Sequence, residues 1–139
     1  MSELEAKEAA LLAASAAADK KGSDIVVVEV GPVLVITEYF VIVTGSNDRQ
    51  VKAIVDEVEK RLKEAGLHAI GREGEQQAAW VLLDFGDIVV HVFQPAERDF
   101  YRLERLWGDA PRLQLPEEPA AAGQDEQVVT PVDGGPLQQ

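Results

Sequence analysis

The sequence predicts a single α/β domain, in which a mixed β-sheet of about five strands is flanked by helices. Runs rich in β-branched residues alternate with segments whose apolar residues recur at helical spacing. The chain has 139 residues, of which 46% are hydrophobic, and this is enough for one core and hardly for two. We therefore expect one domain over residues 1–116, followed by an acidic tail over 117–139 that is disordered because it lacks aromatic residues and is rich in Pro, Gly and Gln.

The N-terminal part predicts a helix and two neighbouring strands. Ser2 and Glu5 match a capping box that would open an alanine-rich helix, and Gly22 would stop it. Residues 24–30 are rich in β-branched side chains, and after a Gly-Pro interruption a second extended region is strongest over 40–44. We expect these two strands to lie side by side.

Residues 48–65 show the clearest helical pattern in the chain, and Gly66 is placed to cap the helix. Its apolar positions are Val51, Ile54, Val55, Val58, Leu62 and Ala65. A short strand over 67–70 is expected to follow. The strand at 40–44, the helix and this strand would form a right-handed βαβ unit with a parallel pair of strands.

The segment 79–93 predicts a β-hairpin whose two loop residues are Phe85 and Gly86, with Asp84 opposite Asp87. Alternation then divides the side chains between two faces. One face is mixed in character and holds Trp80, Leu82, Asp84, Asp87, Val89 and His91, with Trp80 opposite His91. The other face is wholly apolar and is expected to form the core under the helices; its members are Val81, Leu83, Ile88 and Val90.

A last helix is predicted over 95–107, opened by Pro95 and ended by Gly108. One apolar stripe runs along it, made of Phe100, Leu103, Leu106 and Trp107.

Composition excludes some classes of function. The chain has no cysteine, so it offers neither a thiolate nucleophile nor a cysteine-based zinc site. Its 25 acids and 13 bases give a net charge of −12, which disfavours direct, charge-driven binding of nucleic acid. The N-terminus lacks the pattern of a signal peptide, and no apolar run is long enough to span a bilayer, so we expect a cytoplasmic protein without a membrane partner.

Gly45 and Ser46 lie between a strand and a helix, where free backbone N–H groups can hold an anion. The turn has neither the lysine of a phosphate-binding loop nor the spacing of a dinucleotide-binding loop. Asn47 and Gln50 match instead an N-terminal cap that would satisfy the same N–H groups. We predict a structural turn and keep phosphate binding as the alternative.

The candidates for a metal site are equally weak. Asp84 and Asp87 could hold a magnesium ion, but acids that flank a hairpin turn are more often solvated. His91 and His68 lie on different predicted strands, and we expect His91 to pack against Trp80 rather than bind zinc.

Three segments occur in a characteristic order: EYFVIVTGSNDRQVKAIVDEV, GREGEQQAAWVLLDFGDIVVHVF and ERDFYRLERLWGDAP. The last of them contains the pattern Arg98, Tyr101, Leu103, Glu104, Leu106 and Trp107. In this combination the chain resembles the ribosomal silencing factor family, also called RsfS or iojap-related proteins. The resemblance covers about residues 4–112 and departs from the family pattern at Gly31-Pro32 and at Glu38, where Asp is commoner.

The resemblance implies a cytoplasmic factor that binds the large ribosomal subunit through ribosomal protein number fourteen on the intersubunit face. Such a factor blocks joining of the small subunit and thereby represses translation when nutrients are limiting. The resemblance also implies a nucleotidyltransferase-like fold without the full set of catalytic carboxylates, and therefore no enzyme activity, cofactor or metal. A negative chain suits a basic ribosomal protein. We predict these partner-binding residues: Trp80, Leu82, Asp87, His91 and Tyr101.

Two other functions stay open from the sequence. One is a nucleotidyltransferase-like enzyme that uses the Gly45-Ser46 turn and a metal at Asp84 and Asp87. The other is a homodimeric adaptor with no ribosomal role. A homodimer is also compatible with the silencing function.

Overall fold

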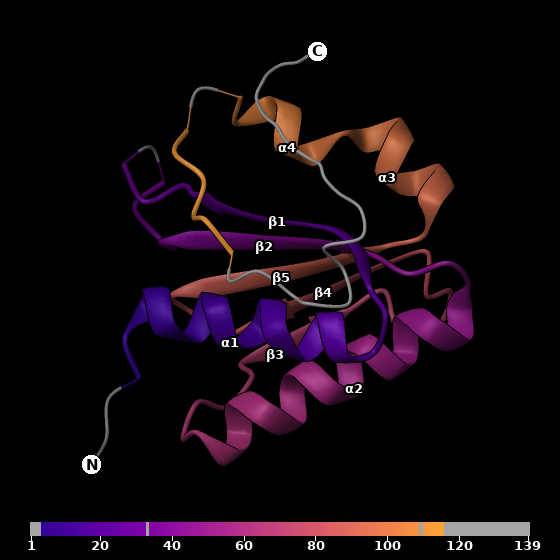
Figure 1. Cartoon of the computed structure of the whole chain (residues 1–139), viewed down its shortest axis with the longest axis horizontal. Helices are drawn as coiled ribbons and strands as arrows, with labels where there is room; N and C mark the ends of the chain where they lie inside the picture. Colours follow the sequence, from indigo (N-terminus) through magenta and orange to yellow (C-terminus); the bar gives the residue numbers. More distant parts are fainter. Residues whose placement is uncertain (1–3, 33, 109, 116–139) are drawn as a thin grey trace.

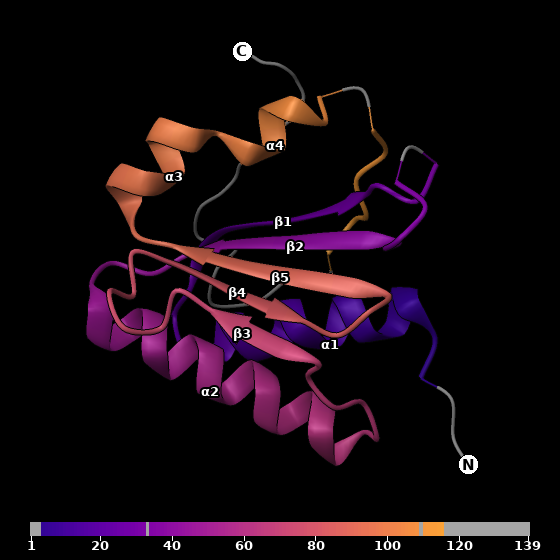
Figure 2. The same ribbon diagram turned by 180° about the vertical axis from the view of Figure 1, so that it is seen from behind.

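The computed structural model describes residues 4–32, 34–108 and 110–115. A five-stranded mixed sheet lies at its centre, with the strand order β1-β2-β5-β4-β3. The strands are β1 (Ser23–Glu29), β2 (Tyr39–Thr44), β3 (Gly71–Glu73), β4 (Trp80–Asp84) and β5 (Ile88–Phe93). The helices α1 (Ala6–Asp19) and α2 (Asp48–Glu64) lie on one side of the sheet, and α3 (Pro95–Tyr101) and α4 (Leu103–Leu106) lie on the other (Figure 1, Figure 2). The predicted α/β class with a five-stranded mixed sheet is confirmed.

Helix α1 begins later than the capping pattern predicted. The backbone N–H of Glu5 donates to the carboxylate of Glu8 at 3.3 Å, and these two residues form a capping box. Ser2 itself lies outside the described residues. At the other end Gly22 follows the helix as predicted, and its N–H donates to the carbonyl of Ala17 at 2.9 Å.

The parallel pair of strands differs from the prediction. Strand β2 pairs in parallel with β5, whereas residues 67–70 form no strand. The third strand is β3, which pairs antiparallel with β4 at the edge of the sheet. The reason is burial: β5 is apolar apart from one histidine and suits the centre of the sheet, whereas all three residues of β3 are exposed and suit an edge.

The β4–β5 hairpin is shifted by two residues from the predicted register. Leu82 lies opposite His91, and Trp80 lies opposite Phe93. A shift of two residues leaves the β4 and β5 side chains on their predicted faces, whereas Asp87 lies in the loop. The loop residues are Gly86 and Asp87 rather than Phe85 and Gly86, because Gly86 adopts a φ of 92°.

The hairpin loop is held by two hydrogen bonds. The N–H of Phe85 donates to the carbonyl of Ile88 at 3.0 Å, which closes the two-residue loop. The N–H of Gly86 donates to Oδ1 of Asp84 at 2.8 Å. Phe85 is buried in the core, and this explains why it does not occupy the loop.

The predicted helix over 95–107 is broken in the structure. Arg102 adopts a left-handed conformation with φ of 46°, which ends α3 and precedes α4. The predicted apolar stripe is also wrong, since Phe100 is 78% exposed and Leu106 is 73% exposed. Leu103 and Trp107 do pack, half-buried, against the sheet.

Apolar side chains cover both faces of the sheet. The larger cluster lies between the sheet and the helices α1 and α2, and it contains the predicted core positions Val81, Leu83, Ile88 and Val90. The smaller cluster lies under α3 and α4 and is centred on Val28, Val30, Ile42 and Phe93. Among the described residues, no helix is both long enough and apolar enough to cross a membrane.

Candidate protein-binding face

An aromatic cluster occupies the sheet face on the side of α3 and α4. Trp80 stacks on Phe93 with ring centroids 4.8 Å apart, and it contacts Tyr101 of α3 at the same centroid distance. Phe40 of β2 continues the cluster, with its ring 4.7 Å from His91 and 5.8 Å from Trp107. The antiparallel β4–β5 pair and the parallel β2–β5 pair place these side chains on one face.

Trp80 and His91 form a direct polar contact inside this cluster. The indole Nε1 of Trp80 donates a hydrogen bond to Nδ1 of His91 at 3.2 Å. Because Nδ1 accepts, the neutral ring carries its proton on Nε2, which has no hydrogen-bond partner among the described residues. His91 is 4% exposed, and burial lowers its pKa to about 4, so the ring is neutral at pH 7.

The structure brings together four of the five predicted partner-binding residues. Trp80 and Leu82 are half-buried, Tyr101 is 47% exposed, and His91 is buried beneath them. Asp87 is separate from the others, because it lies in the hairpin loop before β5 whereas Trp80 lies opposite the end of that strand. His91 therefore supports the face rather than forming its surface.

Phe40 and Trp107 belong to this face but were absent from the predicted set. Phe40 could have been found only by pairing β2 with β5, whereas the sequence predicted a different parallel partner for β2. Trp107 was assigned to a helical stripe, yet it lies at the end of α4 and reaches Phe40. Both residues depend on tertiary pairings that local patterns do not specify.

A buried ion pair positions α3 and α4 over the face. Arg98, which is 8% exposed, donates from Nε to both carboxylate oxygens of Glu104 at 3.1 Å. Its Nη1 also donates to Oγ1 of Thr44 at 2.8 Å, which ties α3 to the end of β2. The pair spans the break at Arg102, so Tyr101 on one side of the break and Trp107 on the other are held in place.

The face also carries negative charge. Register places Glu73 of β3 beside Leu82, and Asp84 lies on the same face. Neither carboxylate takes part in an ion pair with another described residue within 4.0 Å. Half-buried aromatic side chains beside unpaired acids suit a partner with basic side chains around an apolar contact.

The Gly45-Ser46 turn is filled by its own caps. Oδ1 of Asn47 accepts from the N–H of Gln50 at 2.8 Å, and Oε1 of Gln50 accepts from the N–H of Ser46 at 2.6 Å. A Cβ at Gly45 would lie 2.9 Å from Cγ2 of Val51, so the glycine permits close contact between β2 and α2. The structural interpretation of the turn agrees with this geometry.

No group of three or more His, Asp or Glu side chains within the described ranges is arranged to hold a metal ion. Asp84 accepts the hydrogen bond from the N–H of Gly86, and Asp87 is itself a residue of the hairpin loop. The pair therefore serves the turn.

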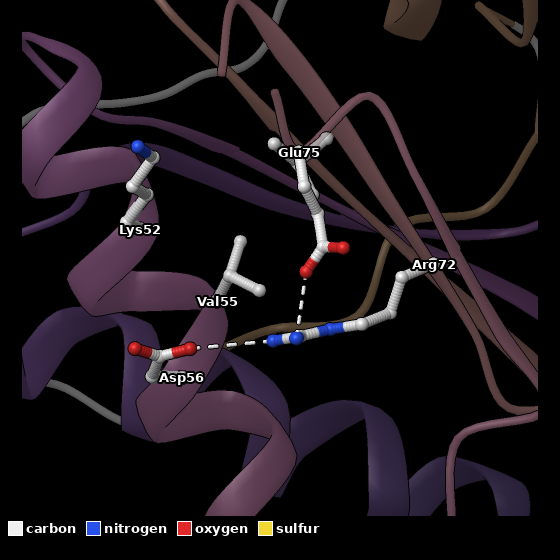
Figure 3. A pocket seen from close by; sticks show the side chains of 6 residues that line it. Lys52, Val55, Asp56, Arg72 and Glu75 are labelled. Carbon is white, nitrogen blue, oxygen red and sulfur yellow. Dashed lines mark hydrogen bonds and ion pairs between the residues drawn. The ribbon is translucent and has the colours of Figure 1, made fainter. Parts of the chain in front are cut away.

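A small pocket lies between α2 and the β3 segment, with a volume of about 140 Å³. Figure 3 shows the guanidinium of Arg72 between Asp56 and Glu75. Arg72 also pairs with Glu59 at 2.9 Å, so three carboxylates surround one cation. This arrangement fastens the sheet edge to α2, and the three carboxylates balance the positive charge of Arg72.

Comparisons with known proteins agree with the fold and the motifs. The family described as "Ribosomal silencing factor during starvation" matches residues 3–133, which extends beyond the range 4–112 over which the motifs resemble it. The chain is 44% identical over 104 residues to Ribosomal silencing factor RsfS of Halalkalibacterium halodurans, covering 75% of this chain and 89% of that protein. It is 37% identical over 105 residues to the chloroplastic protein Iojap of Arabidopsis thaliana, covering 76% of this chain and 44% of that protein.

A solved structure gives the same result. The crystal structure of a protein from Chromobacterium violaceum superposes with a TM-score of 0.73 at 38% identity, covering 86% of this chain and 99% of that one. The match of the family to most of the chain, together with relatives above 40% identity, shows that the chain belongs to the ribosomal silencing factor (RsfS) family.

Proposed function

We propose that this protein binds the large ribosomal subunit and blocks joining of the small subunit, which represses translation when nutrients are limiting. The partner we propose is ribosomal protein number fourteen on the intersubunit face. Family membership supports the ribosomal role, and one relative, from Mus musculus, is named for mitochondrial assembly of the large ribosomal subunit. The location we propose is the cytoplasm, where the protein would encounter the ribosomal subunits.

The observation that carries the proposal is the aromatic face with its unpaired acids. Trp and Tyr are the side chains that most often dominate binding energy at protein interfaces, and Trp80 and Tyr101 lie in contact there. Glu73, opposite Leu82, and Asp84, at the hairpin end of β4, add negative charge to the same face, in a chain of net charge −12. A basic ribosomal protein would be attracted by this charge and held by the aromatic contact.

We further propose that the protein acts by steric blocking rather than by catalysis. The turn at Gly45-Ser46 has its N–H groups capped, and Asp84 is bound to the backbone of Gly86. A nucleotidyltransferase-like reaction would need a triphosphate cradle and a carboxylate pair free to bind metal. The capped turn and the engaged aspartate favour a binding protein.

Two sedimentation experiments test the proposal. Tagged protein in a lysate at low magnesium, where the subunits are apart, should comigrate with the large subunit and not with the small one. Purified subunits mixed with the protein and then brought to high magnesium should yield fewer joined ribosomes. Absence of comigration, or unchanged joining at saturating protein, would overturn the proposal.

A further inference from the structure

Four exposed cations gather where α1 ends and α2 begins. Lys20 and Lys21 follow α1, whereas Arg49 and Lys52 lie in the first turns of α2. The two segments are joined by Gln50, whose Nε2 donates to the carbonyls of Lys20 at 3.0 Å and Lys21 at 2.9 Å. Residues about thirty positions apart are thus fixed next to each other; we call these four side chains the basic surface.

The charges of the basic surface are unpaired. Among the described residues, none of its four side chains lies within 4.0 Å of a carboxylate. Figure 3 shows Lys52 pointing away from Asp56, which is engaged by Arg72. Asp19, which adjoins Lys20, is paired with Arg61. Four other cations, on separate segments of the chain, also have no carboxylate of a described residue within 4.0 Å: Lys7, Lys63, Arg105 and Arg112. The basic surface differs from them because its four cations lie on two segments that Gln50 joins. The exposed Asp48 at the start of α2 offsets one of these charges and leaves a local excess of positive charge, in contrast to the net charge of −12.

The backbone under the basic surface is rigidly packed. A Cβ at Gly22 would lie 2.7 Å from Cγ1 of Val43 and 3.3 Å from Cδ1 of Ile54, so the turn after α1 lies tightly against β2 and α2. Lys21 adopts a φ of 67°, which directs the chain from α1 into β1. The backbone positions of the cations are therefore set before any partner binds.

The chemistry of the basic surface favours a series of phosphates. The N–H groups of Ser46 and Gln50 are already capped, so the side chains alone would supply the positive charge. Exposed cations spread over two segments suit phosphate groups spaced along a nucleic-acid backbone better than one enclosed anion. The attraction is local, because charges beyond roughly 8 Å are largely screened at physiological salt, and the overall net charge does not cancel it.

The basic surface is connected to the aromatic face. The N–H of Gly45 donates to the carbonyl of Phe93 at 2.8 Å, and the ring of Phe93 stacks on Trp80. Ser46 and the start of α2 follow directly. The aromatic face at Trp80 and the basic surface therefore lie at the same end of the sheet, on opposite sides of it, and a partner as large as a ribosomal subunit can reach both (Figure 1).

We propose that Lys20, Lys21, Arg49 and Lys52 contact the phosphate backbone of ribosomal RNA when the protein is docked on the large subunit. This inference rests on the proposed function and adds a second contact of different chemistry to it. The net charge of −12 disfavours nucleic-acid binding by the chain as a whole, but it does not describe the local charge of the basic surface.

The test compares two variants that remove equal charge. The first carries Lys20→Gln, Lys21→Gln, Arg49→Gln and Lys52→Gln. The control carries Lys7→Gln, Lys60→Gln, Lys63→Gln and Arg112→Gln, all at exposed positions outside the basic surface. Circular dichroism and thermal unfolding establish that both are folded. Affinity for isolated large subunits is then measured over a range of salt concentrations.

The native protein and the control should share one salt slope, whereas the first variant should bind at least tenfold more weakly with a shallower slope. The slope should fall by roughly 0.7 to 0.9 for each phosphate that is no longer neutralised by a cation. Affinity for purified ribosomal protein fourteen should be equal in all three. An unchanged slope in the first variant, or an equal weakening in the control, would overturn the RNA contact.

Weaker binding of the first variant to purified ribosomal protein fourteen would assign the basic surface to protein binding and would also overturn the RNA contact. Failure of the native protein to bind large subunits would instead reject the proposed function, and the inference with it.

Discussion

Nε1 of Trp80 donates to Nδ1 of His91 at 3.2 Å, which joins a half-buried aromatic side chain to a buried imidazole. The bond holds His91 in the tautomer with its proton on Nε2. It also fixes the indole plane above Phe93 and beside Tyr101. Two consequences can be measured, one in the pH dependence of stability and one in partner binding.

Replacing His91 by Phe should remove part of the acid sensitivity of the fold. Burial lowers the pKa of His91 from 6.5 to about 4 in the folded state. Below pH 6.5 the unfolded chain therefore binds a proton that the folded chain does not, so the free energy of unfolding falls as the pH is lowered from 6.5 to about 4. The loss over this window should be on the order of 3 kcal/mol. Urea unfolding at several pH values measures it.

The exposed His68 provides the control for this experiment. His68→Gln should keep the native pH dependence, whereas His91→Phe should flatten it between pH 6.5 and 4. A His91→Phe curve parallel to the native one would show that folding does not lower the pKa of His91.

The sequence was sufficient where local chemistry decides the structure. The face of each β4 and β5 side chain follows from alternation, and a two-residue error in register left it unchanged. The cap by Asn47 at the start of α2 was likewise predictable, because it depends on residues within one turn. Local patterns were therefore enough to predict the α/β class and the β4 and β5 residues of the aromatic face.

The sequence was insufficient where distant segments compete for one position. The place beside β2 went to β5 rather than to residues 67–70, and only this pairing brings Phe40 next to His91. Arg98 and Glu104 pair across the break at Arg102. Arg98 is also bonded to Thr44, which lies 54 residues away. Helical periodicity contains no information about such a contact.

Trp80→Glu should reduce affinity for the large subunit at least tenfold, because it places a charge at the centre of the aromatic face. Some loss of thermal stability is also expected, since Trp80 packs on Phe93 and bonds to His91. Leu12→Glu is the matched control, because Leu12 is also half-buried but lies on α1, across the sheet. The control should lose stability and keep binding. Equal comigration of Trp80→Glu and native protein with large subunits would contradict the placement of the interface.

Arg98→Met should destabilise the fold by about 3 kcal/mol, because it leaves the carboxylate of Glu104 partly buried and unpaired. The double variant Arg98→Met with Glu104→Met should recover part of this loss, as expected when the unpaired charge is the cause. Arg102→Met removes an exposed pair with Asp99 and should change stability by less than about 1 kcal/mol. Chemical denaturation of the four proteins gives the comparison. If Arg98→Met were as mild as Arg102→Met, the pair would not hold α3 and α4.

The turn between β2 and α2 should respond to packing and not to nucleotides. Gly45→Val should destabilise the fold by about 2 kcal/mol, because its side chain would overlap Val51, whose Cγ2 and N would lie 2.9 and 3.1 Å from the new Cβ. Ser46→Ala should cost less than about 1 kcal/mol, since it removes two exposed hydrogen bonds, one to Gln50 and a long one from Asn47, and leaves the Asn47 cap on Gln50 intact. Calorimetric titration with ATP, GTP or CTP and magnesium at physiological salt should show no saturable site. The nearby cations are exposed and spread over two segments, and the N–H groups that would cradle a triphosphate are already bonded to Asn47 and Gln50. A micromolar nucleotide site that disappears in Ser46→Ala would contradict this and would make catalysis the better account of the fold.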